Sequence, residues 1–190
     1  MVWSCLVSIL PGMAQTEKLT DYVNPFVGTD GYGNVYPGAQ IPFGGIQISP
    51  DTDSRFYDAA SGYKYNHLTL MGFSLTHLSG TGIPDLGDFL FIPGTGEMKL
   101  EPGTHEDPDQ GYRSRYSHDK EWASTNYYAV ELADYGVKAE MTSGVRSGMF
   151  RFTYPESDNA FIMIDMNHTL WQSCEWSNLR MINDSTITGY

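Results

Sequence analysis

Two short loops carry the residues whose types are best suited to binding a polar ligand. The first lies in the stretch from Gly72 to Pro93, which reads GFSLTHLSGTGIPDLGDFLFIP. Its polar middle supplies the candidate contacts His77, Ser79, Gly80, Thr81 and Asp85. Glycine loses more backbone freedom on folding than any other residue, so a glycine-rich loop of this kind is unfavourable for stability. We interpret it as backbone that approaches a ligand closely.

The second loop runs from Gly28 to Asn34 and reads GTDGYGN. Its candidate contacts are Gly28, Thr29, Asp30, Gly31 and Asn34, and Tyr63 from the later segment SGYKY is added as an aromatic contact. Short polar side chains on glycine-rich backbone can hydrogen-bond the hydroxyls of a ligand and hold it in place. We predict that the two loops lie together and form one wall of a ligand pocket.

Several of these candidates also have a purely structural interpretation. His77 follows Phe73 at alternating positions of an apolar strand, so a hydrogen-bonded core histidine is an equal alternative. Asp85 and Asp88 could cap the turn by accepting hydrogen bonds from nearby backbone, the commoner role of aspartate among glycines. Tyr63 could belong to the core, which the pattern favours.

The composition is that of a soluble globular domain. The chain has 190 residues, of which 41% are hydrophobic and 18% are charged, enough for one domain with a substantial core. Its net charge of -12 disfavours binding to nucleic acid or an anionic membrane, and no segment is long and apolar enough to span a bilayer. The 14% aromatic content is typical of all-β proteins and also of sites that stack on sugar rings; the β interpretation is favoured.

The first fifteen residues are interpreted as a partial signal peptide. An apolar run from Val2 to Leu10 is followed by Gly12-Met13-Ala14, which resembles the small residues before a signal-peptidase cut. After such a cut only Cys174 remains, so an internal disulfide is excluded. We therefore expect an exported protein without disulfide support.

From Thr20 onward the pattern indicates an all-β, antiparallel β-sandwich. Strands are expected over 45–49, 126–132, 137–142, 147–153 and 161–166, and the three central ones are separated by turn signals as in a meander. Single helical turns are expected at 118–123 and 171–180. Another strand begins at Thr186 and continues to Tyr190, so we expect the sandwich to be truncated at its carboxyl-terminal end.

Common catalytic motifs are missing from the sequence. There is no GxSxG elbow, no HExxH and no GxxxxGK[ST] phosphate loop. Asp51-Thr52-Asp53 and the 30–34 segment offer oxygen atoms for calcium, but without EF-hand spacing. A calcium site at these positions is therefore a minor alternative.

Four ordered segments nevertheless resemble a known family. NPFVGTDGYGNVYPGAQIPFGGIQISPDT (24–52), SGYKY (61–65), the Gly72–Pro93 stretch, and YSHDKEWASTNYYAVELADYGVKAEMT (116–142) are similar to the amino-terminal domain of glycoside hydrolase family 92. The resemblance covers about residues 19–190. It implies a β-sandwich of the galactose-mutarotase-like (supersandwich) type, packed on a larger (α/α)-barrel domain with the active site between them.

The resemblance also implies an activity and a location. Members are exo-acting, inverting α-mannosidases that need calcium, so we expect hydrolysis of terminal α-mannosides, with the α-1,2 linkage favoured. The partners implied are a mannose-containing glycan, either N-glycan or mannan, and the downstream catalytic domain. Most members are bacterial and exported, which implies a periplasmic, cell-surface or secreted protein.

This sequence departs from the family pattern in two respects. It ends before the barrel domain, which in the family carries the general acid, the general base and the calcium ligands, so no catalytic or metal-binding residue is assigned here. In addition, the loop between Arg55 and Ser61 lacks a tryptophan that relatives often have, which implies an altered subsite. Two further hypotheses stay open: a carbohydrate-binding module without catalysis, and a purely structural sandwich that supports a partner domain.

Overall fold

The computed structural model describes residues 17–54 and 57–190. The predicted signal peptide, at residues 1–15, lies outside the described residues. No helix in the described part of the chain has the length and apolar character needed to cross a membrane. The helices described there are four short 3₁₀ segments: η1 (Leu19–Tyr22), η2 (Tyr57–Ala59), η3 (Pro108–Gln110) and η4 (His118–Lys120).

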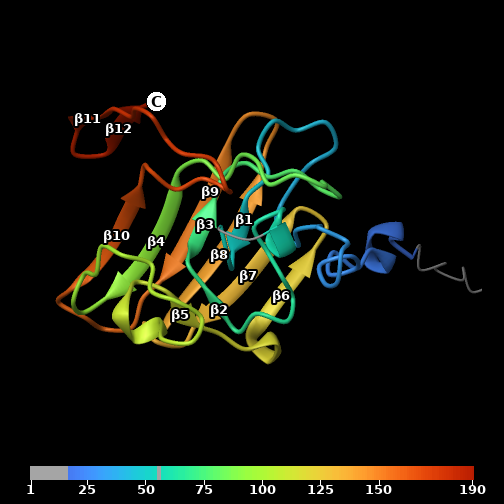
Figure 1. Ribbon diagram of the computed structural model, residues 1–190, viewed down its shortest axis with the longest axis horizontal. Coiled ribbons are helices and arrows are strands. Elements are labelled where there is room, and N and C mark those ends of the chain that lie inside the picture. Colours follow the sequence, from blue (N-terminus) through green and yellow to red (C-terminus); the bar gives the residue numbers. More distant parts are fainter. Residues whose placement is uncertain (1–16, 55–56) are drawn as a thin grey trace, which may run out of the picture.

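Two four-stranded antiparallel sheets form the body of the domain (Figure 1). The first sheet has the order β1-β3-β4-β10, made of β1 (Ser49–Asp51), β3 (Gly72–Ser74), β4 (Leu90–Thr95) and β10 (Ala160–Asp165). The second is the meander β6-β7-β8-β9, made of β6 (Glu121–Ser124), β7 (Tyr127–Leu132), β8 (Val137–Ser143) and β9 (Gly148–Thr153). The predicted meander is therefore confirmed.

Two small strand pairs complete the fold. β2 (Thr69–Leu70) pairs with β5 (Ser114–Arg115), and β11 (Leu179–Asn183) pairs with β12 (Thr186–Gly189). The β11–β12 hairpin stands away from the body of the domain near the carboxyl end of the chain, as Figure 1 shows. All of its residues are exposed.

The core lies between the two sheets. Alternate residues of β8 point into it, so Val137 and Ala139 are buried while Lys138 between them is not. From the first sheet, Phe73 reaches the rings of Phe150 and Phe152, with centroids 6.4 and 6.3 Å away. A shared apolar cluster across two antiparallel sheets confirms the β-sandwich.

Three local predictions need correction. The segment from Trp171 to Arg180 is not helical: Trp171 has a left-handed backbone (φ 75°), and its N–H bonds to the carbonyl of Ser54 rather than to a helical partner. At 118–123 only the first three residues form a 3₁₀ turn, and β6 follows directly. The strand expected at 45–49 is displaced: β1 starts at Ser49, preceded by an isolated bridge between Ala39 and Ile48.

Candidate functional site

The two glycine-rich loops, named here the rim loops (28–34 and 77–85), meet in the structure. The backbone N–H of Gly80 donates to the carbonyl of Asn34 at 2.7 Å. The segment 63–65 is hydrogen-bonded to the first loop: Lys64 Nζ donates to the Gly31 carbonyl at 2.8 Å, and the Tyr65 N–H donates to the Thr29 carbonyl at 2.9 Å. The rim loops therefore form one continuous edge, as the sequence predicts.

The exposed part of this edge combines glycine backbone and short polar side chains with the large apolar side chains of Tyr32, Leu78 and Ile83. Asp30, Gly31, Ser79 and Gly80 are exposed, as is Asp85. Gly31 and Gly80 adopt left-handed backbone, with φ of 60° and 69°, which residues with a side chain rarely adopt. These are the predicted contacts that the fold leaves open to a ligand.

The remaining candidates in the rim loops are less accessible. Gly28 and Thr81 are half-buried, and Thr29 and Asn34 are buried. The hydroxyls of both threonines donate to nearby carbonyls, of Phe26 and Ile83 respectively. These residues shape the loops from within.

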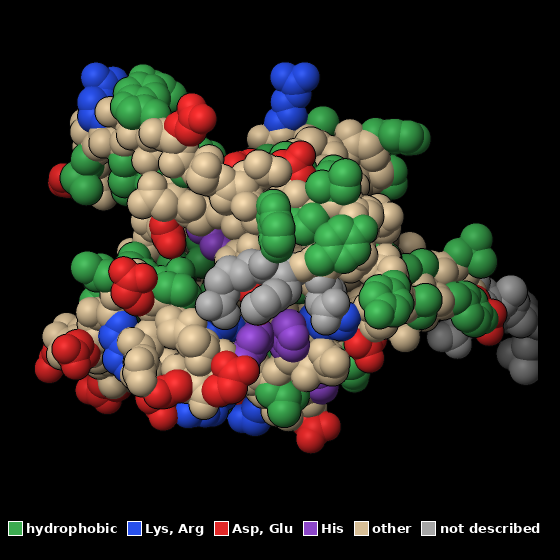
Figure 2. All heavy atoms as spheres, in the orientation of Figure 1, with side chains coloured by type: hydrophobic (Ala, Val, Ile, Leu, Met, Phe, Trp, Pro, Cys, Tyr) green, Lys and Arg blue, Asp and Glu red, His purple; other side chains and the backbone are tan. Residues whose placement is uncertain are grey.

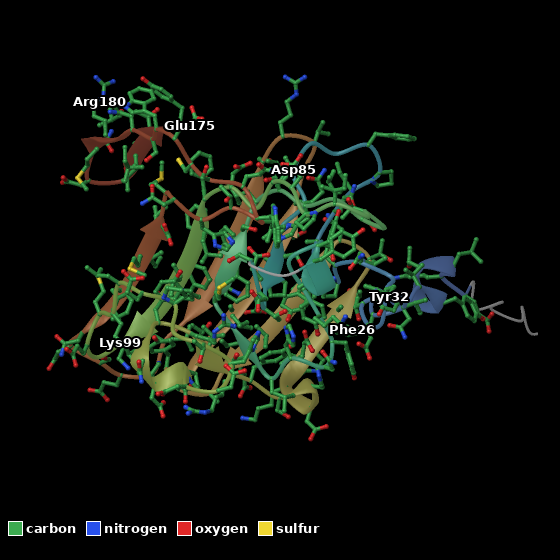
Figure 3. All side chains as sticks on the ribbon, in the orientation of Figure 1. Phe26, Tyr32, Asp85, Lys99, Glu175 and Arg180 are labelled. Carbon is green, nitrogen blue, oxygen red and sulfur yellow. The ribbon has the colours of Figure 1, made fainter. Side chains whose placement is uncertain are left out.

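Asp85 lies at a different part of the edge from the first loop. In Figure 3 it is well separated from Tyr32, which belongs to the 28–34 segment. Its carboxylate accepts the N–H of Leu86 at 2.8 Å, which is the capping geometry that the sequence left open as an alternative. The side chain is nevertheless exposed, so a ligand can still reach it.

His77 and Tyr63 are placed in the core rather than on the edge. His77 is 2% exposed, and its Nδ1 donates to the Gln47 carbonyl at 2.7 Å. Tyr63 is 1% exposed, and its hydroxyl donates to the buried carboxylate of Glu121 at 2.9 Å. Burial, with the charge of Glu121 among the further causes, raises the pKa of Tyr63 well above its usual range. The geometry favours the core interpretation of both residues.

A buried carboxylate joins the second rim loop to another part of the chain. Asp51 is fully buried, and its two oxygens lie 2.8 Å from His77 Nε2 and 2.8 Å from His168 Nε2. Burial alone would raise the pKa of Asp51, but the charge of His77 and the hydrogen bonds from both histidines outweigh it and hold that pKa well below its usual range. Because Nδ1 of His77 already donates to a carbonyl, its bond to the ionised Asp51 is that of an imidazolium.

Glycine makes room for this carboxylate. A Cβ on Gly62 would lie 2.0 Å from Asp51 Oδ1, and the Gly62 backbone has φ of 84°. No other residue fits at that position without displacing the Asp51 carboxylate. The three residues His77, Asp51 and His168 are together called the buried triad below.

His168 also lines a surface hollow of about 490 Å³. Its lining includes Ser54, Tyr112, Asp165, Asn167, His168 and Trp171. The mixture of an exposed indole with hydroxyl, amide and carboxylate groups is typical of sites that bind polar ligands. None of these residues was among the ligand contacts predicted from the sequence.

A second polar cluster follows β1. His105 Nε2 lies 3.3 Å from Asp53 Oδ2, and the His105 ring lies 4.1 Å from that of His67 between centroids. Histidine side chains gather at the centre of the face shown in Figure 2. Burial, followed by the charge of His105, lowers the pKa of His67 to about 4, so this ring is neutral at pH 7. The buried guanidinium of Arg113 donates to the Thr52 carbonyl and fixes the same segment.

The resemblance places the calcium ligands in the downstream domain, and the described residues offer no evident site for the ion. Within residues 17–54 and 57–190, no group of three or more His, Cys, Asp or Glu side chains is arranged to hold a metal ion. Asp51 and Asp53, which belong to one of the two minor calcium alternatives, face histidines instead.

The geometry defines an antiparallel β-sandwich domain with a polar face built from loops. A family model, the glycosyl hydrolase family 92 N-terminal domain, matches residues 22–190. The chain therefore belongs to the family of glycosyl hydrolase family 92 N-terminal domains.

Solved structures and a curated relative agree with this membership. A family GH92 alpha-mannosidase from Bacteroides thetaiotaomicron (BT3965), also solved in complex with mannoimidazole, is 99% identical over 91% of this chain and 23% of its own length, with a TM-score of 0.90. The family GH92 inverting mannosidase BT2199 of the same species is 26% identical over 79% of this chain and 20% of its own, with a TM-score of 0.63. An uncharacterized secreted glycosidase of Arthroderma benhamiae is 29% identical over 139 residues, which are 72% of this chain and 17% of that protein.

Proposed function

We propose that this domain is the amino-terminal part of an inverting exo-α-mannosidase and that its rim loops form one wall of the mannose pocket. The observation that carries the proposal is the hydrogen bond between Gly80 and Asn34, which joins two loops distant in sequence into one exposed polar edge. The similarity to mannosidases that are about four times longer supports the assignment of the remaining machinery to the rest of the protein.

An inverting hydrolase needs a general acid and a general base roughly 6.5–9.5 Å apart, with room for a water between them. We assign both groups, and the calcium dependence of the enzyme, to the larger domain. The role of this chain is to bind and orient the sugar and to exclude bulk water from the reacting carbon. Exposed groups of Asp30, Ser79 and Asp85 would accept or donate hydrogen bonds to hydroxyls, each contributing about 1 kcal/mol.

The proposed substrate is a terminal α-mannoside, with an α-1,2 linkage as the first to test, and the proposed location is outside the cytoplasm. The curated secreted glycosidase that matches most of this chain supports export. Fractionation of producing cells, followed by detection of the protein with an antibody, tests the location.

The activity is tested by comparing this chain with the full-length enzyme on an α-1,2-linked mannobiose. We expect mannose release, with inversion of the anomeric centre, from the full-length protein and none from this chain alone. Release by this chain alone would show that the acid and base lie within it and would overturn the division of labour proposed here.

The purely structural alternative is supported by the burial of His77 and Tyr63. Replacing the exposed Ser79 and Asp85 by alanine in the full-length enzyme separates it from the proposed function. We expect kcat/KM to fall about tenfold or more for the double variant with unchanged thermal stability, as two lost hydrogen bonds imply. Unchanged kcat/KM would support the structural alternative.

A further inference from the structure

Trp171 is held in an unusual conformation beside the 490 Å³ hollow. Its φ of 75° lies in the left-handed region, which is unfavourable for a bulky residue and persists only where the surroundings enforce it. The indole is nevertheless 59% exposed, so its burial does not compensate for the strain. Strained residues of this kind cluster at ligand-binding sites.

The backbone around Trp171 is fixed from both sides. The Trp171 N–H donates to the Ser54 carbonyl at 2.9 Å, and the N–H of the preceding Leu170 donates to the Leu86 carbonyl at 2.7 Å. Leu170 itself is buried and packs over Gly87, where an added Cβ would lie 2.7 Å from the leucine side chain. The turn is closed by a hydrogen bond from the Thr169 hydroxyl to the Gln172 carbonyl at 2.5 Å. The indole is therefore presented on a rigid support.

His168 supplies an oriented hydrogen-bonding group to the same hollow. The side chain is buried, and its Nε2 donates to the ionised Asp51. A carboxylate only accepts, so Nε2 of His168 carries a proton. Among the described residues, Nδ1 of His168 has no hydrogen-bond partner. The contact with Asp51 thus holds the imidazole of His168 in one orientation at the wall of the hollow.

We propose that this hollow is a binding site for one sugar ring of the substrate, with Trp171 as the stacking platform and the imidazole of His168 as a hydrogen-bonding partner for a hydroxyl. A pyranose has an apolar face of C–H groups and a polar edge, which match an indole face flanked by hydrogen-bonding groups. The exposed side chains of Asn167 and Gln172 lie on the same lining and supply further polar contacts. This inference rests on the proposed function, because it takes the ligand to be a mannoside.

The test uses the full-length α-mannosidase that carries this domain, with mannoimidazole binding measured by calorimetry and kcat/KM measured on α-linked mannobiose. We expect Trp171→Ala and Trp171→Leu to weaken binding or lower kcat/KM by about tenfold or more. Trp171→Leu keeps an apolar side chain of substantial volume but removes the aromatic ring. It therefore tests the contribution of the ring even if Trp171→Ala impairs folding. Trp171→Phe keeps an aromatic face and should recover most of the loss.

The matched control is Trp176→Ala. Trp176 is also exposed, at 65%, but it contacts Tyr190 next to the β11–β12 hairpin and does not line the hollow. We expect its replacement to leave both measurements unchanged.

Two results would overturn the inference. One is wild-type binding and kcat/KM in folded Trp171→Leu. The other is a loss of binding and of kcat/KM in Trp171→Leu that comes with a lower Tm of the enzyme and is not recovered by Trp171→Phe. That result would mark the indole as a packing contact with the rest of the protein. If the wild-type enzyme neither binds mannoimidazole nor hydrolyses the mannobiose, the proposed function fails instead.

Discussion

The meander sheet and the β1 side of the domain are held together by different interactions. On β8, Val137 and Ala139 are buried against other apolar residues. On β1 and just after it, Asp51 and Asp53 are equally buried but are surrounded by histidines. Burying a charge is costly even when it is paired, whereas apolar packing is favourable in itself.

This difference indicates that the β1 side fixes the positions of particular side chains, whereas the meander sheet mainly stabilises the fold. Apolar cores tolerate a range of arrangements of similar volume, whereas a buried carboxylate must keep its hydrogen-bond partners. Asp51 fixes His77, at the start of the second rim loop, and His168, in the wall of the hollow. We propose that the buried triad positions the face to which we assign ligand binding.

The largest expected effect is that of Asp51→Asn. The imidazolium of His77 then loses its buried counter-charge, which costs about 3–5 kcal/mol of the free energy of unfolding. Chemical denaturation of this chain at pH 7 measures it, with the exposed Asp85→Asn as the control, for which little change is expected. A loss below about 1 kcal/mol for Asp51→Asn would show that the charge of Asp51 in the buried triad adds little to the free energy of unfolding.

A comparable truncation on the meander side is Leu132→Ala. Leu132 is 2% exposed, and removing a buried leucine side chain costs about 3 kcal/mol through lost burial and a cavity. The same measurement at pH 7 and pH 5 should give the same loss, because no titrating group is involved. A strongly pH-dependent loss would contradict the contrast between the two sides.

The β1 side should also respond to acid in two steps. The folded pKa of His67 is about 4, below its unfolded value of ~6.5. The unfolded chain therefore takes up the proton first, and stability that is complete above pH ~6.5 is lost as the pH falls toward 4. The lowered pKa of Asp51 adds a second loss that starts near its unfolded value of ~3.9.

His67→Gln isolates the first of these steps. The fall in Tm between pH 7 and pH 4.5 should be smaller in this variant than in the wild type, since glutamine does not titrate. Equal falls in the two proteins would show that His67 does not carry the first step.

The smallest effect is expected for a carboxylate on the meander itself. Glu140 accepts hydrogen bonds from the guanidinium of Arg151, which, with the hydroxyl of Tyr127, lowers the pKa of Glu140 to about 2. Arg151 is largely exposed, and such pairs contribute little. We expect Glu140→Gln to cost about 0.5–1 kcal/mol by chemical denaturation; a loss as large as that of Asp51→Asn would remove the distinction between a carboxylate paired with an exposed cation and one whose partners are buried.

The same contrast explains how much of the fold was predictable. The meander was found from the sequence because alternation of apolar residues and the turn signals around Gly136 and Gly144 are local. The rim loops were found because glycine marks special backbone. The triad was not found, since Asp51 and His168 are 117 positions apart and nothing local marks them as partners.

The error at Trp171–Arg180 has a related cause. Local propensity allowed one helical turn there, but the backbone N–H of Trp171 bonds to Ser54, far away in the sequence. The hollow beside it was missed for the same reason, because its lining comes from segments between Ser54 and Gln172. A usable signal was the close spacing of Asp165, Asn167, His168 and Trp171 after an apolar strand.

The most direct test of the central idea, that the buried triad positions the ligand-binding face, compares kcat/KM for α-linked mannobiose between Asp51→Asn and Leu132→Ala in the full-length enzyme. Both are assayed at a temperature where both are fully folded. We predict a loss of about tenfold or more for Asp51→Asn and a value within about twofold of wild type for Leu132→Ala. Equal activity of the two variants, at the wild-type level, would contradict the account.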